Sequence, residues 1–452
     1  MEKKSPIPLV HLWIAKGVLG IEAIRSPRFR RLFKESVWIA LGQAMAMLGL
    51  LVGVRLLTEL LGPAAYGELA LGMTAATLAN QIMFGPLGGG VIRFYAPAVE
   101  QGDWGSYLSA VRRLAWSATA VIVLMMIVGV VGLQVAGRTE WIAIAITALI
   151  FAALSGYNSI LSGIQNAARQ RSIVALHQGM ESWARFLIAV GFMLWFGASS
   201  TVAMAGYAVA ALIVLGSQYI FFRKITSNSG SSITGKEQRW RKQIWQFSWP
   251  ISIFGIFTWL QLVSDRWALG HFSTIQEVGL YAVLFQLGYY PMSIASGMVM
   301  QLLVPIVYQR AGDASDSRRN ADVKNLNWRI TWMILGMTGV VFLIAIAFHI
   351  QIFRLFVAKE YMSVSYLLPW MFLAGGIFAA AQTIALNLMS QLKTHAMMTA
   401  KITTALLGVA LNCAGAYWFG TLGIVIASII FSVLFFAWMA WLSEGIGEKN
   451  CL

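Results

Sequence analysis

The sequence has 452 residues, of which 58% are hydrophobic and only 11% charged, and its net charge is +15. Soluble domains carry roughly 25% charged residues, so these few charges cannot cover a soluble surface of this size. The lysines and arginines fall in alternate segments between apolar stretches, not on one folded face, which argues against a nucleic-acid partner. The two cysteines and five scattered histidines show no disulfide or metal-site spacing.

Apolar windows occupy most of the chain, and a helix needs roughly 20 apolar residues to cross a bilayer. Eight charge-free windows supply one helix each: 36–54, 69–92, 114–137, 141–168, 243–264, 278–309, 330–353 and 361–392. Two longer windows, 186–222 and 402–443, supply two helices each, with breaks at 197–201 and 419–423. The fifth helix is expected to begin near Val174. Because open strands would leave backbone groups unpaired in lipid, we predict an all-α integral membrane protein of about twelve transmembrane helices.

Basic residues in the connections predict the orientation of the helices. With a cytoplasmic N-terminus, most of the 33 lysines and arginines fall on the inner side, and both termini are cytoplasmic. The outer side then keeps Arg55, Arg138, Arg266, Arg354 and Lys359. A missed or additional helix would have scrambled this imbalance.

The predicted helices divide into two lobes of six. The expected segments are a basic, interfacial N-terminal stretch (1–35), an N-terminal lobe (36–222), a basic cytoplasmic linker (223–242), a C-terminal lobe (243–443) and a cytoplasmic tail (444–452). Six is an even number, so both lobes enter the membrane from the same side, as parallel repeats related by a pseudo-two-fold axis along its normal. YGELA at 66–70 and VGLYA at 278–282 open the second helix of each lobe and support this repeat. Chance recurrence of short motifs is the alternative.

Glycine and proline interrupt several predicted helices. The second, seventh and eighth helices together contain Gly85, Pro86, Gly88, Gly89, Gly90, Pro250 and Pro291. Interrupted helices in a duplicated bundle often mark the substrate site, so these residues are candidates for bending and gating. The alternative is that the glycines only allow close helix packing.

Ionisable residues within or at the ends of the predicted helices are few: Arg55, Glu59, Arg93, Glu181, Arg185, Asp265 and Arg266. Charge in a spanning helix is costly and tends to be functional. Glu181 and Arg185 lie four residues apart on one helical face, where they can pair. For the residues at helix ends, snorkelling to the membrane interface is the alternative.

Several short motifs in one order resemble a known family. They are RLL at 55–57 with LLGPAAYG at 60–67, Asp265-Arg266 with EVGLYA at 277–282, and Glu360-Tyr361. From about residue 30 to its end the chain resembles the polysaccharide exporter family, which includes the O-antigen-type flippases of the multidrug/oligosaccharidyl-lipid/polysaccharide (MOP) exporter superfamily.

The resemblance implies a V-shaped bundle of two lobes around a polar cavity in the bacterial inner membrane. It implies alternating-access transfer of polyprenyl-diphosphate-linked saccharide to the outer leaflet for O-antigen, lipopolysaccharide or exopolysaccharide synthesis. The expected partners are that substrate, membrane lipids and other polysaccharide-assembly proteins. No cofactor and no enzymatic activity are expected, and a proton or sodium gradient is the expected driving force.

The diphosphate of such a substrate is a strong anion, and arginine suits phosphate by its forked geometry. We expect Arg55 and Arg266 to form an outer cluster for it, and Arg93 and Arg185 an inner one. Ion coupling or charge pairing is expected of three acidic residues: Glu59, Glu181 and Asp265.

Two other functions stay open. A cation-coupled multidrug exporter of the same superfamily is less favoured, because some exporters of this kind place an acidic residue in the first helix and residues 36–54 contain none. A membrane glycosyltransferase or polymerase is also less favoured, because the outer connections are too short for a catalytic domain, as at 138–140.

Overall fold

The structure is a computed structural model and describes residues 27–226, 237–311, 316–390 and 394–448. The predicted interfacial stretch lies largely outside these residues, as do half of the predicted linker and the end of the predicted tail. Within the described residues the chain is helical and contains no strand, which confirms the all-α prediction.

The first half of the described chain contains α3 (Pro27–Leu60), α4 (Pro63–Ala79), η1 (Asn80–Phe84), α5 (Gly85–Glu100), α6 (Trp104–Val135), η2 (Thr139–Trp141), α7 (Ile142–Ala167), α8 (Arg171–Phe196) and α9 (Ser200–Thr226). The second half contains α10 (Glu237–Phe272), α11 (Ile275–Leu284), η3 (Phe285–Tyr289), α12 (Tyr290–Ala311), α13 (Ser317–Phe356), η4 (Lys359–Leu367), α14 (Leu368–Ser390) and α15 (Thr394–Glu448).

Ten of the described helical segments are long and apolar enough to cross a membrane. One of them, Thr399–Glu444, consists of two helices, because the backbone of Gly420 is non-helical (φ 56°, ψ −133°). The chain folds back there, and a Cβ atom on Gly408 would lie 3.1 Å from the ring of Phe431. Helix α8, with 26 residues, is long enough to cross a membrane but is not among these ten apolar segments. With α8 included and the α15 hairpin taken as two helices, the described chain contains the twelve membrane-length helices expected.

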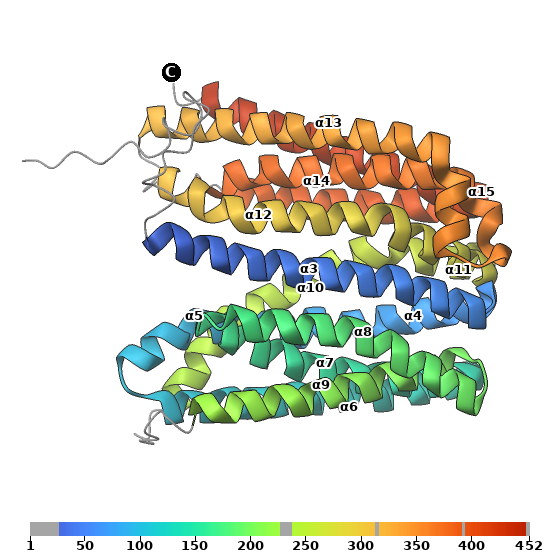
Figure 1. Cartoon of the computed structure of the whole chain (residues 1–452), viewed down its shortest axis with the longest axis horizontal. Helices are drawn as coiled ribbons and strands as arrows, with labels where there is room; N and C mark the ends of the chain where they lie inside the picture. Colours follow the sequence, from blue (N-terminus) through green and yellow to red (C-terminus); the bar gives the residue numbers. More distant parts are fainter. Residues whose placement is uncertain (1–26, 227–236, 312–315, 391–393, 449–452) are drawn as a thin grey trace, which may run out of the picture.

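The helices run side by side along one axis of the bundle (Figure 1). At the right-hand end α3 turns into α4 and α13 into η4, and we refer to this end as the predicted outer end. The opposite end, where α6 and α10 begin, is the predicted inner end. Large apolar side chains stay exposed along the bundle, including Leu124 and Val128 of α6 and Met337 and Leu343 of α13. Lipid solvates such a surface, whereas water does not.

Three sets of helix contacts organise the bundle. Helix α3 packs mainly against α8 and lies between α8 and α12 in Figure 1. Helix α10 packs against α15 of the second half and also against α5 and α6 of the first half. Helices α4 and α11 pack against each other across the halves. The halves are therefore tied together along α10, and their separation into two domains stays a prediction.

The second helix of each half is interrupted just before a proline. The π-helix η1 begins at Asn80, six residues before Pro86, and η3 begins at Phe285, six residues before Pro291. Proline has no N–H group, and its ring clashes with the carbonyl four residues earlier. One extra residue in the turn, as in a π-helix, relieves that clash. The helices are thus irregular where the prolines predict it, while a gating role for them stays a prediction.

Gly67 of α4 and Gly279 of α11 meet in a reciprocal backbone contact at the predicted outer end. A Cβ atom on Gly67 would overlap the carbonyl oxygen of Ile275, and one on Gly279 would overlap that of Pro63. Each glycine therefore lies against a carbonyl group of the other helix, and that carbonyl belongs to the residue four positions before the other glycine. A local two-fold relation between the two helices produces such a contact. It supports the predicted repeat, but it involves only α4 and α11, so the repeat of the whole lobes stays a prediction.

An acidic side chain near the start of α4, and another in α11, binds the beginning of the last helix of its half. Glu68 of α4 accepts a 2.6 Å hydrogen bond from the hydroxyl of Ser200, where α9 begins. Glu277 of α11 accepts hydrogen bonds from the backbone N–H (2.7 Å) and the hydroxyl (2.9 Å) of Thr421. Negative charge is favourable at a helix start, where N–H groups lack helical partners and the helix dipole is positive.

We expect Gly67→Ala or Gly279→Ala to destabilise the protein by about 1–3 kcal/mol, because the new methyl group overlaps backbone that cannot rotate away. The measurement is the unfolding temperature in detergent, followed by tryptophan fluorescence. Gly129→Ala is the control, since no atom lies within 4 Å of its Cβ position. Equal unfolding temperatures for all three variants and the parent would contradict the close helix crossing.

Candidate functional site

A buried carboxylate lies in α10, about two helical turns from the predicted outer end. Asp265 is 5% exposed. Its Oδ2 accepts a 2.7 Å hydrogen bond from the Tyr281 hydroxyl, and its Oδ1 accepts one of 2.7 Å from the backbone N–H of Arg266. The guanidinium of Arg266 lies 3.4 Å from the same Oδ1. Three donors therefore compensate the burial of this charge.

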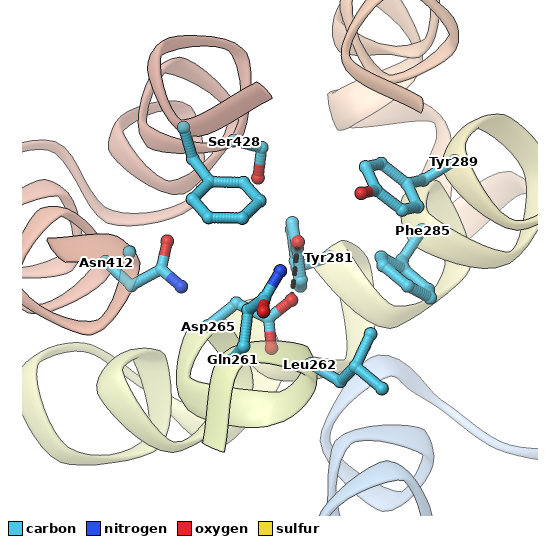
Figure 2. Close-up of a pocket in the computed structure, with 10 residues that line it drawn as sticks. Gln261, Leu262, Asp265, Tyr281, Phe285, Tyr289, Asn412 and Ser428 are labelled. Carbon is cyan, nitrogen blue, oxygen red and sulfur yellow. Dashed lines mark hydrogen bonds between the residues drawn. The ribbon is translucent and has the colours of Figure 1, made fainter. Parts of the chain in front are cut away.

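Asp265 faces a small pocket between α10, α11, η3 and α15 (Figure 2). Its volume is about 40 Å³, and it is lined by Gln261, Leu262, Asp265, Tyr281, Phe285, Tyr289, Gly408, Asn412, Ser428 and Phe431. A cavity needs about 10–15 Å³ of such volume to hold one water molecule. The pocket can therefore accommodate water or a bare cation, but not a saccharide.

The polar groups around this pocket come from α10, α11, η3 and α15. Asn412 and Ser428 approach it from the two arms of the α15 hairpin, while Asp265 and Tyr281 come from α10 and α11 (Figure 2). The amide of Asn412 also donates a 2.8 Å hydrogen bond to Ser264. Carboxylate, amide and hydroxyl oxygens are ligands of hard cations, and a buried carboxylate can also carry a proton. The pocket thus has the chemistry to bind a cation or a proton in competition with Arg266.

Arg266 lies against an aromatic ring. Its guanidinium stands 4.4 Å from the centre of the Phe285 ring, a favourable cation–π distance. The Nη1 group also donates a 3.1 Å hydrogen bond to the carbonyl of Leu262. Only 11% of the side chain is exposed. Arg266 is therefore a positive charge held inside the bundle, one residue from Asp265.

Arg185 occupies a comparable aromatic setting in the first half. Its guanidinium lies 5.7 Å from the ring of Phe151 and 5.8 Å from that of Tyr207, and Glu181 is 3.8 Å away. Side-chain exposure is 28% for both Arg185 and Glu181, so the predicted pair exists and is half-buried. The buried Nε of Arg185 has no hydrogen-bond partner among the described residues. This donor is therefore unsatisfied in the conformation described.

A buried tyrosine of the first half bonds to the second half. Tyr66 is 2% exposed and donates a 3.1 Å hydrogen bond to Gln286 of η3. The residue before Gln286 is Phe285, whose ring lies against Arg266. Tyr66 thus joins α4 to the segment that holds the ring against Arg266.

Arg55 binds the second half at the predicted outer end. It donates a 3.2 Å hydrogen bond to the carbonyl of Arg354 and another to that of Val357, and it pairs with Glu59 as predicted. These partners satisfy its guanidinium at the junction between α3 and the end of α13. The predicted cluster of Arg55 with Arg266 stays a prediction, because their described partners are different.

Two further hydrogen bonds join the same segments. The backbone N–H of Ala358 donates to the hydroxyl of Thr58 (3.2 Å), and the hydroxyl of Tyr361 donates to the carbonyl of Leu61 (2.8 Å). Together with the contacts of Arg55 they form what we call the outer latch, between Arg55, Thr58 and Leu61 of the first half and Arg354, Val357, Ala358 and Tyr361 of the second.

The other predicted site residues lie elsewhere. Arg93 is exposed on α5, outside the aromatic setting of Arg185, and their predicted inner cluster stays a prediction. Gly90 is packed closely enough that a Cβ atom would lie 2.6 Å from the hydroxyl of Ser248, whereas Gly88 has open space. Pro250 is exposed within α10.

Sequence reasoning missed the neutral residues of the site. Tyr281 and Tyr66 lie inside the quoted EVGLYA and LLGPAAYG motifs, and those motifs were the available signal. Asn412 and Ser428 carry no sequence signal, because isolated polar residues in apolar helices are common. Only the fold brings them to Asp265.

Comparison with known proteins gives the family. The sequence model of the family described as polysaccharide biosynthesis protein matches residues 32–310. No curated protein matches the sequence.

Solved structures of MOP-superfamily transporters share the fold. The inward-facing conformation of a multidrug resistance MATE family transporter superposes with a TM-score of 0.70 at 15% identity, covering 91% of this chain and 96% of that one. The lipid II flippase MurJ in its inward closed conformation gives 0.66 at 12% identity, covering 90% and 87%. A MOP-superfamily transporter from Pyrococcus furiosus gives 0.60 at 14% identity, covering 94% and 98%.

The family match spans more than half of the chain, and the shared fold extends over nine-tenths of it. The protein is therefore a multi-pass membrane protein of the polysaccharide biosynthesis protein family with the fold of the MOP-superfamily transporters.

Proposed function

We propose that this protein is a flippase of the bacterial inner membrane. It moves polyprenyl-diphosphate-linked oligosaccharide or polysaccharide units from the cytoplasmic to the outer leaflet, for the synthesis of cell-surface polysaccharide. The family supports the link to polysaccharide, and the fold supports transport and not enzymatic catalysis. In this proposal both termini are cytoplasmic, and residues 36–222 and 243–443 form the two lobes.

The observation that carries the substrate class is the placement of Arg185. It lies within a lipid-exposed bundle, partly buried, with an Nε donor that no described residue uses. A charge in such a position is costly unless it serves a function. Diphosphate offers several acceptor oxygens to a guanidinium, and Arg266 is a second guanidinium held inside the bundle, with 11% of its side chain exposed. A drug exporter for cationic compounds would gain nothing from these two arginines.

Transport then proceeds by alternating access, with the outer latch formed in the inward-facing state. Opening toward the outer leaflet must break the contacts of Arg55, Thr58 and Tyr361 with the opposite half. Asp265 supplies the coupling. A proton or sodium ion that enters its pocket competes with Arg266 for the carboxylate. Once the guanidinium of Arg266 is free of the carboxylate, its interaction with the diphosphate changes. The conformational cycle and the ion gradient are thereby linked through one carboxylate.

We expect deletion of the gene to cause accumulation of a complete polyprenyl-linked saccharide that is shielded in intact spheroplasts and accessible after lysis. Complementation with Arg185→Gln should leave transfer about ten- to a hundredfold slower, because a charge-assisted contact with phosphate is lost. Arg138→Gln, an exposed arginine at the predicted outer end, is the control. Normal saccharide turnover with increased sensitivity to cationic dyes would assign the protein to the drug exporters. Loss of polymer without any lipid-linked intermediate would favour a glycosyltransferase or polymerase.

Asp265→Asn should abolish the acceleration of transfer by an imposed gradient in proteoliposomes that contain a fluorescent lipid-linked saccharide. A tenfold proton or sodium gradient supplies about 1.4 kcal/mol, so the parent should accumulate up to about tenfold more product on the outer side. Glu140→Gln removes an exposed carboxylate and serves as control. A gradient response that survives in Asp265→Asn would place the coupling group elsewhere.

A cross-link between Thr58→Cys and Ala358→Cys should arrest transfer until reductant is added, because it holds the outer latch closed. Both native cysteines are first replaced by serine. The control pair, Gly42→Cys with Ala175→Cys, joins α3 to α8, and the corresponding Cβ positions are 3.2 Å apart. It should cross-link without arresting transfer. Continued transfer with the latch cross-linked would show that this end does not open.

A further inference from the structure

A groove lies between α6 and α10 at the predicted inner end. Its volume is about 450 Å³, and it is lined by Leu114, Ser117, Gln238, Arg241, Lys242 and Trp245. The lining residues of α10 belong to its first turns, close to Glu237 where the helix begins. In the predicted orientation, the groove therefore lies at the level of the headgroups of the cytoplasmic leaflet.

The groove faces the periphery of the bundle. Trp240, Ile244 and Ser248 lie on the inner face of α10, where Trp240 packs against Tyr107 and Ser248 donates a 3.0 Å hydrogen bond to the carbonyl of Pro86. Gln238, Arg241, Lys242 and Trp245 recur at helical spacing and form the adjoining face of the same helix. Trp245 is 54% exposed, and Trp116 of the neighbouring helix is 66% exposed. The groove thus opens beside aromatic side chains of the kind that mark a membrane interface.

The charges of this region leave the groove positive. Glu237, the acidic residue where α10 begins, forms a 2.9 Å ion pair with Arg113 of α6, so its charge is already compensated. Arg239 stands over the ring of Trp240, at 5.7 Å from its centre. Arg241 and Lys242 therefore present two positive charges in a groove whose other sides are apolar or neutral, Leu114 and Trp245 among them.

We propose that this groove binds an anionic phospholipid of the cytoplasmic leaflet, with the phosphate between Arg241 and Lys242 and the glycerol and upper acyl chains against Leu114 and Trp245. Basic pockets between transmembrane helices at the cytoplasmic surface suit such headgroups. The groove accommodates a headgroup and glycerol, while the chains extend along the exposed apolar face of α6. Because α6 belongs to the first half and α10 to the second, the bound lipid bridges the two halves. This site is separate from the transport path proposed above, and its existence does not depend on the transported substrate.

The test is native mass spectrometry of the purified full chain with phosphatidylglycerol or phosphatidylcholine of equal chain length. The parent should bind phosphatidylglycerol more tightly, and Arg241→Gln with Lys242→Gln should weaken that binding about ten- to thirtyfold. Ser117→Glu, which places a negative charge in the groove, should weaken it as well. The control Arg318→Gln with Arg319→Gln removes the same charge from the exposed start of α13, also on the predicted inner side, and should leave binding unchanged. Unfolding temperatures in phosphatidylcholine establish that every variant is folded.

Equal binding of phosphatidylglycerol by the parent and the groove variants would overturn the proposal, as would an equal loss in the control. Soluble glycerol phosphate, added at the same concentration as the lipid, should not displace it, and displacement would assign the groove to a free phosphate ligand. Displacement by polyprenyl diphosphate would assign the groove to the transport path. Failure of the flippase proposal alone would leave all of these binding results unchanged.

Discussion

Hydrocarbon cannot solvate a charge or an unpaired backbone group, and the placement of charge in this bundle follows from that constraint. The few charges buried among the described residues have partners on the same helix, on other helices or on aromatic rings. Asp265 receives donors from Tyr281 and Arg266, and Arg185 lies among aromatic rings beside Glu181. Glu68 and Glu277, which lie near the ends of helices, satisfy the starts of other helices. The buried Nε of Arg185, which has no partner among the described residues, departs from this constraint.

The spans and their breaks follow from the sequence because hydropathy and turn residues are local properties. The break expected at 419–423 is the non-helical Gly420, and the fifth helix, expected near Val174, begins at Arg171. At the predicted inner end, the helices of the structure extend beyond the apolar windows of the sequence. Helix α6 begins at Trp104 and not near 114, since helices continue beyond the hydrocarbon into the charged interface.

The site was harder to predict for a physical reason. Ionisable residues stand out in an apolar sequence, so Arg185, Asp265 and Arg266 could be identified from the sequence alone. Their neutral partners do not stand out, because a tyrosine or an asparagine near a helix end costs little free energy. The hydroxyl of Tyr281 and the amide of Asn412 become functional candidates only through packing between α10, α11 and α15. The exposed position of Arg93, and the role of Arg55 as a donor to backbone carbonyls, likewise depend on which helices adjoin.

The crossing of α4 and α11 brings backbone directly against backbone, because no side chain intervenes at Gly67 and Gly279. The carbonyls of Pro63 and Ile275 are positioned to accept hydrogen bonds within their own helices, so the glycine contact itself contributes no hydrogen bond between the halves. Two smooth backbone surfaces can also rotate on each other without any change of rotamer. In the proposed transport cycle the crossing can therefore serve as a pivot. Opening must then break the hydrogen bonds that join the halves near it, those of the outer latch and the one from Tyr66 to Gln286.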